Sequence, residues 1–287
     1  MKLGLVINRV NPEEKAIIKA CRKHGVDVHQ FNDQRIQLSL NAEKDIQPEV
    51  DMFLQRSLSF SRGLYTTAAI ENKGYKIINS FDCLHKTGNK LLTTLLLTKN
   101  NLPTPETHIA FKAKTAIKLA KEKMDFPFIT KPIIGSWGRL VSKINDEDAA
   151  RAVFESKDVM GSVYQKIFYL QNYIEPPENE ATDIRVFYLG GKCIAAMGRY
   201  NPKNDFRSNI AIGGKAQPYE ITDEMEQMCQ KIAEIFNGEI LGIDLMKTDD
   251  GYVCIEVNGT PGFAGITRAT NINIGEKIAL YLKENYA

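Results

Sequence analysis

The residues best suited to chemistry lie toward the end of the chain, where two apolar segments flank turn-forming residues between positions 240 and 257. This pattern is typical of a β-hairpin. If its loop centres on Asp250, Asp244 lies opposite Glu256, and the Cβ atoms of such cross-strand neighbours are roughly 4.5–5.5 Å apart. Asn258 follows Glu256 by two residues and projects from the same face. The sequence therefore predicts two carboxylates and an amide converging on one strand face.

Such a group of oxygen donors suits a hard cation. Burying two carboxylates in apolar strands without a cation would be very costly. Mg²⁺ is usually held by a few carboxylates together with substrate phosphates. The alternative is an ordinary solvated strand face whose acidic residues have no functional role.

A second segment, residues 131–139, has the composition of a phosphate-binding loop. Lys131 ends a predicted strand, and Gly135, Ser136 and Gly138 offer backbone N–H groups behind it. The spacing fits neither a Walker A loop nor a Rossmann fingerprint, so an ordinary glycine-rich turn remains the alternative. Trp137, the only tryptophan, either caps the core or shields bound phosphates.

A third segment, residues 169–174, is an apolar strand whose backbone could present an adenine-type edge. Asp183 and Arg185 follow it and share one face of a later strand. They form either a surface salt bridge or a ribose-hydroxyl acceptor and a phosphate ligand.

Composition limits the other functions. The chain has 287 residues, of which 43% are hydrophobic and 25% charged, so it can build packed cores. A net charge of +2 does not call for nucleic acid or an anionic membrane as a partner.

Five widely spaced cysteines fit buried thiols in a reducing cytoplasm, and no signal peptide or membrane span is expected. The four histidines form no zinc motif, and no GxSxG motif is present.

Three stretches of chain must position these residues. The first 80 residues alternate strands and helices and predict a small parallel α/β domain, with strands at 3–7, 26–31, 52–55 and 76–79 and helices at about 12–24 and 63–72. A helix at 90–100 then precedes strands at 108–111 and 128–131 and helices at 115–123 and 146–156. Residues 168–287 predict antiparallel strands, with a hairpin turn at Gly190-Gly191 and helices at 223–236 and 276–285.

Taken in order, these segments resemble the ATP-grasp superfamily, specifically its RimK-type carboxylate–amine ligases. The matching segments are Asn79, Lys90, 102–107, 131–139, 171–174, 183–185, 207–215, 242–245 and 256–258. The resemblance implies an α/β chain of the α+β ATP-grasp fold. A Rossmann-like N-terminal α/β domain (1–88) precedes a central nucleotide-lid lobe (89–168) and a C-terminal lobe (169–287) with an antiparallel sheet and the Mg and substrate site.

Within that family, the segments GSWGRL, RVNPEEKAIIKA and RSNIAIGGKA look most like the LysX-type ligases of lysine biosynthesis. Those join the amino group of α-aminoadipate to the terminal glutamate of a small acidic carrier protein. GTPGFAGITRATNIN also resembles ligases that add glutamate to pterin or deazaflavin coenzymes or to a protein C-terminus. A nucleotide-binding protein without turnover is the remaining alternative.

The resemblance implies an acylphosphate mechanism driven by ATP with two Mg²⁺ ions, Mn²⁺ being an alternative, in a homo-oligomer (dimer or tetramer). The implied metal ligands are Asp244, Glu256 and Asn258. The implied nucleotide-binding residues are Lys90, Lys131, Gly135, Ser136, Trp137, Gly138, Gln171, Asn172, Ile174 and Asp183. The implied catalytic residues are Arg185, Arg199 and Asn209, with Arg207, Gly213 and Gly214 at the substrate. Asn89 departs from the family pattern, which usually has Asp before the lysine matched to Lys90.

Overall fold

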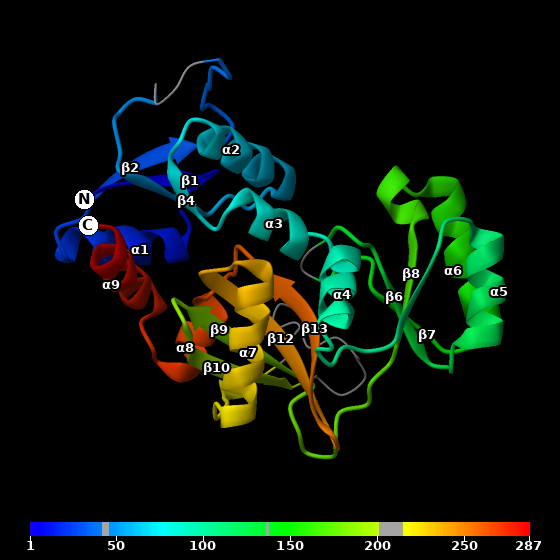
Figure 1. Ribbon diagram of the computed structural model, residues 1–287. Helices are drawn as coiled ribbons and strands as arrows, with labels where there is room; N and C mark the ends of the chain where they lie inside the picture. The colour runs from blue at the N-terminus through cyan, green and yellow to red at the C-terminus, as the bar shows by residue number, and fades with distance from the viewer. Residues whose placement is uncertain (42–45, 136–137, 201–214) are drawn as a thin grey trace.

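Three β-sheets organise the molecule (Figure 1), a computed structural model that describes residues 1–41, 46–135, 138–200 and 215–287. The first sheet is wholly parallel, in the order β2-β1-β3-β4, which confirms the predicted α/β domain. Its strands are β1 (Lys2–Ile7), β2 (Asp27–Asn32), β3 (Met52–Gln55) and β4 (Lys76–Ile78). Its helices are α1 (Pro12–Lys23) and α2 (Phe60–Asn72), followed by α3 (Phe81–Thr87) and α4 (Lys90–Lys99).

Helix α1 begins where the sequence predicted. Asn11 and Glu14 form a capping box, Pro12 opens the first turn, and Gly25 follows the helix with a positive φ. Helix α2 begins three residues earlier than expected, because the Ser59 side chain caps it by accepting the Arg62 N–H. Helix α3 was not predicted, since its seven residues are too few to show an apolar period.

The central sheet is antiparallel, in the order β5-β8-β6-β7. Its strands are β5 (Thr107–Ala110), β6 (Phe128–Lys131), β7 (Ser142–Ile144) and β8 (Phe168–Asn172). Helices α5 (Ala113–Lys123) and α6 (Glu147–Met160) pack on one face, and a short 3₁₀ helix (Val163–Lys166) precedes β8. The boundary predicted at residue 168 is wrong in one respect, because it separates β8 from the β5 and β6 strands that it pairs with.

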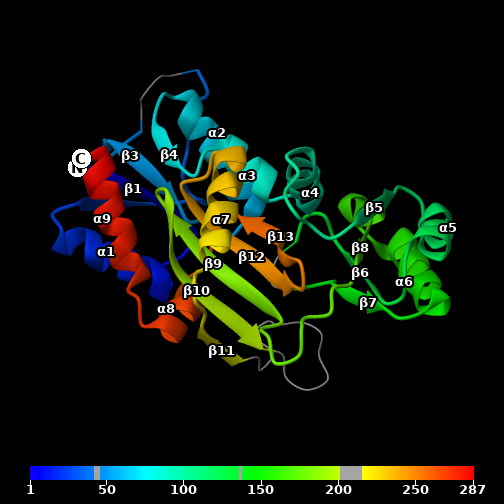
Figure 2. The same cartoon turned by 60° about the horizontal axis from the view of Figure 1, so that its bottom comes forward.

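The C-terminal sheet has the order β11-β10-β9-β12-β13 and is also antiparallel. Its strands are β9 (Asp183–Leu189), β10 (Lys192–Tyr200), β11 (Lys215–Pro218), β12 (Ile240–Thr248) and β13 (Gly251–Asn258). Figure 2 shows α7 (Asp223–Phe236) lying across one face of this sheet. The predicted hairpin turn at Gly190-Gly191 joins β9 to β10. Helices α8 (Ala264–Thr270) and α9 (Ile274–Tyr286) complete the chain.

The two faces of this sheet differ in character. Val186 and Tyr188 pack in the core that includes α7, whereas Phe187 and Leu189 pack in a core with the N-terminal domain. Because side chains alternate along a strand, Arg185 shares the face of Phe187. This second face is therefore apolar near one end of β9 and charged near the other.

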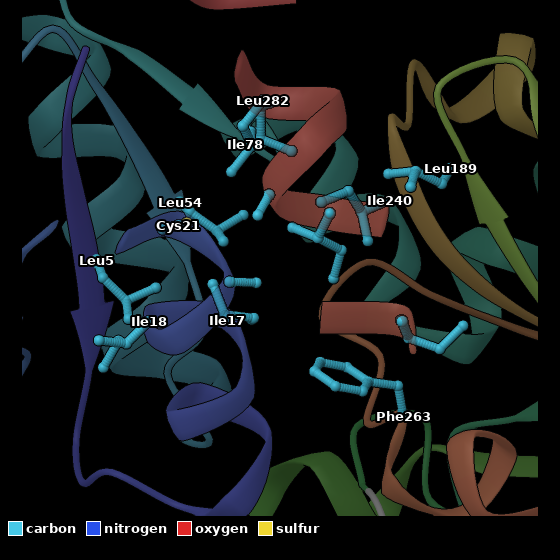
Figure 3. Close-up of a cluster of buried hydrophobic side chains, with 14 of the residues drawn as sticks. Leu5, Ile17, Ile18, Cys21, Leu54, Ile78, Leu189, Ile240, Phe263 and Leu282 are labelled. Atoms are coloured by element: carbon cyan, nitrogen blue, oxygen red, sulfur yellow. The ribbon is translucent and has the colours of Figure 1, made fainter. Parts of the chain in front are cut away.

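The N-terminal domain and the C-terminal sheet share one hydrophobic core. Figure 3 shows Leu5 and Ile17 on one side of this core and Ile240 and Phe263 on the other, with Leu282 of α9 between them. Buried Asn79 reinforces the junction: its amide donates to the Ile240 and Gly259 carbonyls at 2.6 and 2.7 Å, and its oxygen accepts the Glu239 and Ile240 N–H groups. Asn79 therefore holds the start of β12 and the segment after β13 together.

Two further expectations concern the chain as a whole. The five cysteines are free thiols, and four of them are buried, as predicted. Within the described ranges, no helix is long and apolar enough to cross a membrane.

Candidate functional site

The predicted pairing of Asp244 with Glu256 is confirmed, although the turn and the register of the hairpin differ from the prediction. Thr248 pairs with Gly251, so the turn is the two residues Asp249 and Asp250, and its expected centre at Asp250 is wrong. A β-bulge then leaves Ile255 without a partner and shifts the register by one. The extra residue restores Asp244 opposite Glu256, with Gly242 opposite Asn258.

Two arginines hold Asp244, one on the adjacent strand β9 and one on β10 beyond it. Arg185 lies opposite Asp244 on β9 and forms a bidentate pair, through Nε to Oδ1 and through Nη2 to Oδ2 at 2.7 Å. Arg199 of β10 donates from Nη2 to Asp244 Oδ1 at 3.0 Å and from Nε to Asp183. Asp183 is therefore paired with Arg199, so the alternative of a surface salt bridge between Asp183 and Arg185 is wrong.

Both aspartates are buried, with exposed fractions of 6% for Asp183 and 4% for Asp244, so Asp244 does not lie on a solvated strand face. Burial alone would raise the pKa of Asp244, but Arg185 and Arg199 hold it at about 2. Burial raises the pKa of Asp183 to about 6, because Arg199 only partly offsets it and the Asp244 charge adds to it. Burial lowers the pKa of Arg199, but the two carboxylates outweigh this and raise it, so Arg199 stays charged.

Lys90 connects three parts of the site. It is the first residue of α4, and Asn89 caps that helix by accepting the Leu91 and Leu92 N–H groups. Lys90 Nζ donates to Glu256 Oε1 at 3.2 Å and to the Gly135 carbonyl at 2.9 Å. Asn89 thus supplies the cap that an aspartate would supply, which explains how the departure from the family pattern is tolerated at this helix.

Lys131 lies on the face of the central sheet that looks away from α5 and α6. Its ammonium stands 5.6 Å from the ring centroid of Tyr169, its cross-strand neighbour on β8. Burial and the nearby Lys90 charge lower the pKa of Lys131 to about 8, although Glu256 and Asp244 act in the opposite direction. We expect the buried ammonium of Lys131 to bind an anion.

A hydrogen-bonded network that the sequence did not reveal supports Lys131. The Tyr169 hydroxyl bonds to Thr94 Oγ1 at 2.8 Å and accepts from Gln171 Nε2 at 2.9 Å, and Gln171 also donates to Thr107. The signal that could have found it is strand alternation, which places Tyr169 and Gln171 on the Lys131 face.

Two of the expected adenine-lining residues, Gln171 and Asn172, are successive residues of β8 and lie on opposite faces of the central sheet. Asn172 is one residue beyond Gln171, and its amide lies with Glu106, 3.4 Å from Oε2. Its Oδ1 is buried and has no hydrogen-bond partner in the described structure, so an acceptor is left for a ligand or a water. Ile174 follows the end of β8 and is half-buried.

Several predicted site residues lie outside the described residues. They are Ser136, Trp137, Arg207, Asn209, Gly213 and Gly214. Of the glycine-rich loop, Gly135 bonds to Lys90 through its carbonyl and Gly138 has a φ of 64°, which favours glycine.

The donors fit a divalent cation only when it is shared with another ligand. Within the described part of the chain, no three His, Cys, Asp or Glu side chains come close enough to hold a metal ion by themselves. Asp244 and Glu256 pair across the strands, and Asn258 Oδ1 accepts only the Thr260 N–H among described groups. Two carboxylates and an amide, each binding through one oxygen, would leave about half of the octahedral positions of one Mg²⁺ open, which phosphate oxygens and water can fill.

A buried charge cluster behind this site was not predicted. Arg56, which follows β3, is 4% exposed and donates to Glu13, Glu14 and the Pro261 carbonyl, with its guanidinium 5.3 Å from the Phe263 ring centroid. Glu13 in turn accepts the Phe263 and Ala264 N–H groups. The cluster fixes the segment that follows Asn258, and only the tertiary fold brings these distant residues together.

The arrangement can bind a metal-complexed polyphosphate. Lys90 and Lys131 supply cations from one side, and Asp244, Glu256 and Asn258 supply oxygens from the C-terminal sheet. A phosphate chain between them would be neutralised by the lysines and bridged to the carboxylates by the cation.

Two family models and several known proteins match this chain. Residues 87–282 match the family model of the RimK-like ATP-grasp domain, and residues 3–85 match that of the LysX preATP-grasp domain. The alpha-aminoadipate–LysW ligase LysX of Saccharolobus solfataricus is 35% identical, over 95% of this chain and 98% of that protein. The glutamate–LysW ligase ArgX of Sulfurisphaera tokodaii is 35% identical, over 100% of both chains.

The fold is shared with solved structures. An ATP-grasp RimK domain protein from Sphaerobacter thermophilus superposes with a TM-score of 0.77 at 16% identity, covering 99% of this chain and 100% of that one. The expected ATP-grasp fold is thereby confirmed. The chain belongs to the RimK-like ATP-grasp family and is an ADP-forming carbon–nitrogen ligase.

Proposed function

We propose that this ligase joins the amino group of an acidic amino acid, α-aminoadipate or glutamate, to the terminal glutamate of an acidic carrier protein. The observation that carries the proposal is the 35% identity, over essentially the whole chain, to two ligases that act on LysW. Their names differ only in the amino acid, so the comparison supports the acceptor class and leaves two amines to be separated by experiment.

The reaction that we propose has two steps. An oxygen of the acceptor carboxylate attacks the γ-phosphorus of ATP, the bond to the β-phosphate oxygen breaks, and ADP leaves. The amine nitrogen then attacks the acyl carbon, phosphate leaves, and the nitrogen loses a proton to give the amide. Because the acylphosphate already has a good leaving group, the protein mainly has to position the reactants and neutralise charge.

The residues of the site have distinct roles in this proposal. Lys90 and Lys131 bind the α- and β-phosphates, and Asp244, Glu256 and Asn258 hold two Mg²⁺ ions. When bound, the ions would supply positive charge that offsets the charge of the phosphates. Lys90 leaves Glu256 for the phosphates, which frees the Glu256 carboxylate for a cation.

The two arginines orient the acidic ligands. Arg185 and Arg199 hold Asp244 ionised and fix the direction of its oxygens. Their remaining N–H groups are available to the transferring phosphoryl group and the acyl oxygen.

The remaining expectations extend this proposal. Gly135, Ser136, Trp137 and Gly138 cover the phosphates. Gln171, Asn172 and Ile174 line the adenine, with Asp183 near the ribose. Asn209 and Arg207 contact the reacting groups, and Gly213 and Gly214 leave room for the acceptor. The active form is a cytoplasmic homo-oligomer, a dimer or tetramer, whose mass light scattering would measure.

The test is ADP release from Mg-ATP by the purified chain with each amine in turn, paired with a glutamate-terminated acidic peptide. Mass spectrometry of the peptide reads the product. A gain of aminoadipate supports the first amine, and a gain of glutamate supports the second. If neither amine increases ADP release or peptide mass, the acceptor class is wrong.

A further inference from the structure

The outer surface of α1 has a hollow of about 370 Å³ that the proposed reaction does not use. The hollow lies between α1 and the edge strand β2 and is lined by Val10, Lys15, Ile18, Lys19, Arg22 and Gln30. Figure 1 shows α1 at the end of the molecule opposite the central lobe. We call this set of residues the α1 groove.

The groove is cationic because three basic side chains share one face of the helix. Lys15, Lys19 and Arg22 are spaced by four and three residues, so they stand one above another along α1. All three are exposed, and none forms an ion pair with any residue that the structure describes. Their neighbour Lys23 differs, since it pairs with Glu276 at 2.6 Å.

The groove also has an apolar component. Ile18 lies between the basic side chains and is buried, and Val10 is partly exposed at the start of the helix. The methylene stems of lysine and arginine can pack over such a surface while their charges reach a partner. Because the whole chain carries a net charge of only +2, three neighbouring unpaired cations are a local concentration of charge.

The first turn of α1 is attached to the active-site segment. Glu13 accepts the Phe263 N–H at 2.7 Å, and Phe263 lies five residues after Asn258. A helix of 12 residues is about 18 Å long. A partner lying along the groove is therefore within a short length of extended chain of the segment that follows the metal ligands.

We propose that the α1 groove docks the acidic body of the carrier protein, whose C-terminal tail then enters the active site. This inference rests on the proposed function for the identity of the partner as an acidic protein. The charge of the groove and its attachment to the active-site segment support it.

The test uses a fluorescently labelled peptide rich in Glu and Asp that ends in glutamate. At about 20 residues, it is long enough to extend over α1 and into the site. Fluorescence anisotropy at low salt measures its binding to the wild type and to the K15E/K19E/R22E variant. The matched control is K114E/K123E/K231E, which reverses three exposed lysines that form no ion pair with described residues.

We expect K15E/K19E/R22E to weaken binding about tenfold or more, with an effect that shrinks as salt is raised, and the control to bind within about twofold of the wild type. With a short acidic acceptor that cannot reach α1, the kcat of K15E/K19E/R22E should stay at the wild-type value. An equal loss of peptide affinity in both triple variants, or no loss of affinity in either, would overturn the groove assignment. If the wild type binds the peptide through the groove but ligates neither amine, the proposed function and the carrier protein as partner both fail, and only the assignment of the groove to an acidic partner stands.

Discussion

Lys90 Nζ lies 3.2 Å from Glu256 Oε1, so the first residue of α4 is joined to a residue two positions before the end of β13, across 166 residues of sequence. Each of these groups has a different partner in the proposed reaction: phosphate for the lysine and a divalent cation for the carboxylate. The pair neutralises both charges when neither partner is bound. Because Glu256 is the more exposed of the two, solvent can reach the position where the partners exchange.

Glu256→Ala is expected to abolish Mg-dependent ADP formation, with a loss of at least about 100-fold in kcat/KM, because a metal ligand is removed. The thermal unfolding midpoint should stay near that of the wild type, since the side chain is only half-buried. Coupled-enzyme assays of ADP and calorimetry measure the two quantities. Asp250→Asn, at the exposed hairpin tip, is the matched control. Normal turnover by Glu256→Ala would show that the metal assignment is wrong.

The pKa of about 8 for Lys131 predicts how ATP affinity depends on pH. Below pH 8 the ammonium is charged in the free enzyme and attracts phosphate. As the pH rises through 8 the free enzyme loses this proton, while bound phosphate keeps it on, so the Kd for ATP should rise. Titration calorimetry from pH 7 to about 9.5 measures the change, which Lys131→Met should remove.

Lys157 provides the control for this experiment. Burial also lowers its pKa to about 8, but it donates to Thr130 on the opposite face of the central sheet. Lys157→Met should therefore leave the pH dependence of ATP affinity unchanged. If both variants flatten the profile equally, the dependence does not arise from a lysine at the phosphate site.

Asp244→Asn is expected to destabilise the fold by about 3–5 kcal/mol, because Arg185 and Arg199 would stay buried without their shared carboxylate. Asp183→Asn should cost less than half as much, since Arg199 keeps Asp244 as a partner. Urea unfolding at pH 7 measures both free energies. Equal losses would mean that the two aspartates share the arginines evenly, contrary to the geometry.

The opposite pKa shifts of the two aspartates predict opposite pH effects. The pKa of Asp244 is lowered from 3.8 to about 2, so the stability that it contributes is present above pH 4 and is lost as the pH falls toward 2. The pKa of Asp183 is raised to about 6, so its contribution is present below pH 4 and is lost as the pH rises through 6. The free energy of unfolding of Asp183→Asn minus that of the wild type should therefore increase from pH 4 to pH 7, because only the wild type loses this contribution.

Asn79→Ala is expected to cost about 3 kcal/mol or more, because two buried carbonyls and two N–H groups lose their partner. Asn100→Ala is the control, since the Asn100 amide is exposed and donates only to the Leu96 carbonyl one turn earlier. Chemical unfolding measures the difference. A cost below about 1 kcal/mol for Asn79→Ala would mean that water replaces these hydrogen bonds.

The sequence alone determined the elements that depend on local patterns. Asn11, Pro12 and Gly25 bound α1 because capping and backbone freedom act within a few residues. The apolar alternation of β12 and β13 with turn residues between them predicted the hairpin and brought Asp244 opposite Glu256. The ordered set of segments from Asn79 to Asn258 was enough to indicate the family.

Tertiary structure decided which distant groups meet. The bulge at Ile255 set the register, because the local pattern fixes alternation but not the position of an inserted residue. The partners of Asp183 and Asp244 depended on the strand order β10-β9-β12, which places Arg199 and Arg185 beside them. The meeting of Lys90 with Glu256, and of Arg56 with Pro261, required the lobes to pack together, and no periodicity within one segment encodes contacts at that range.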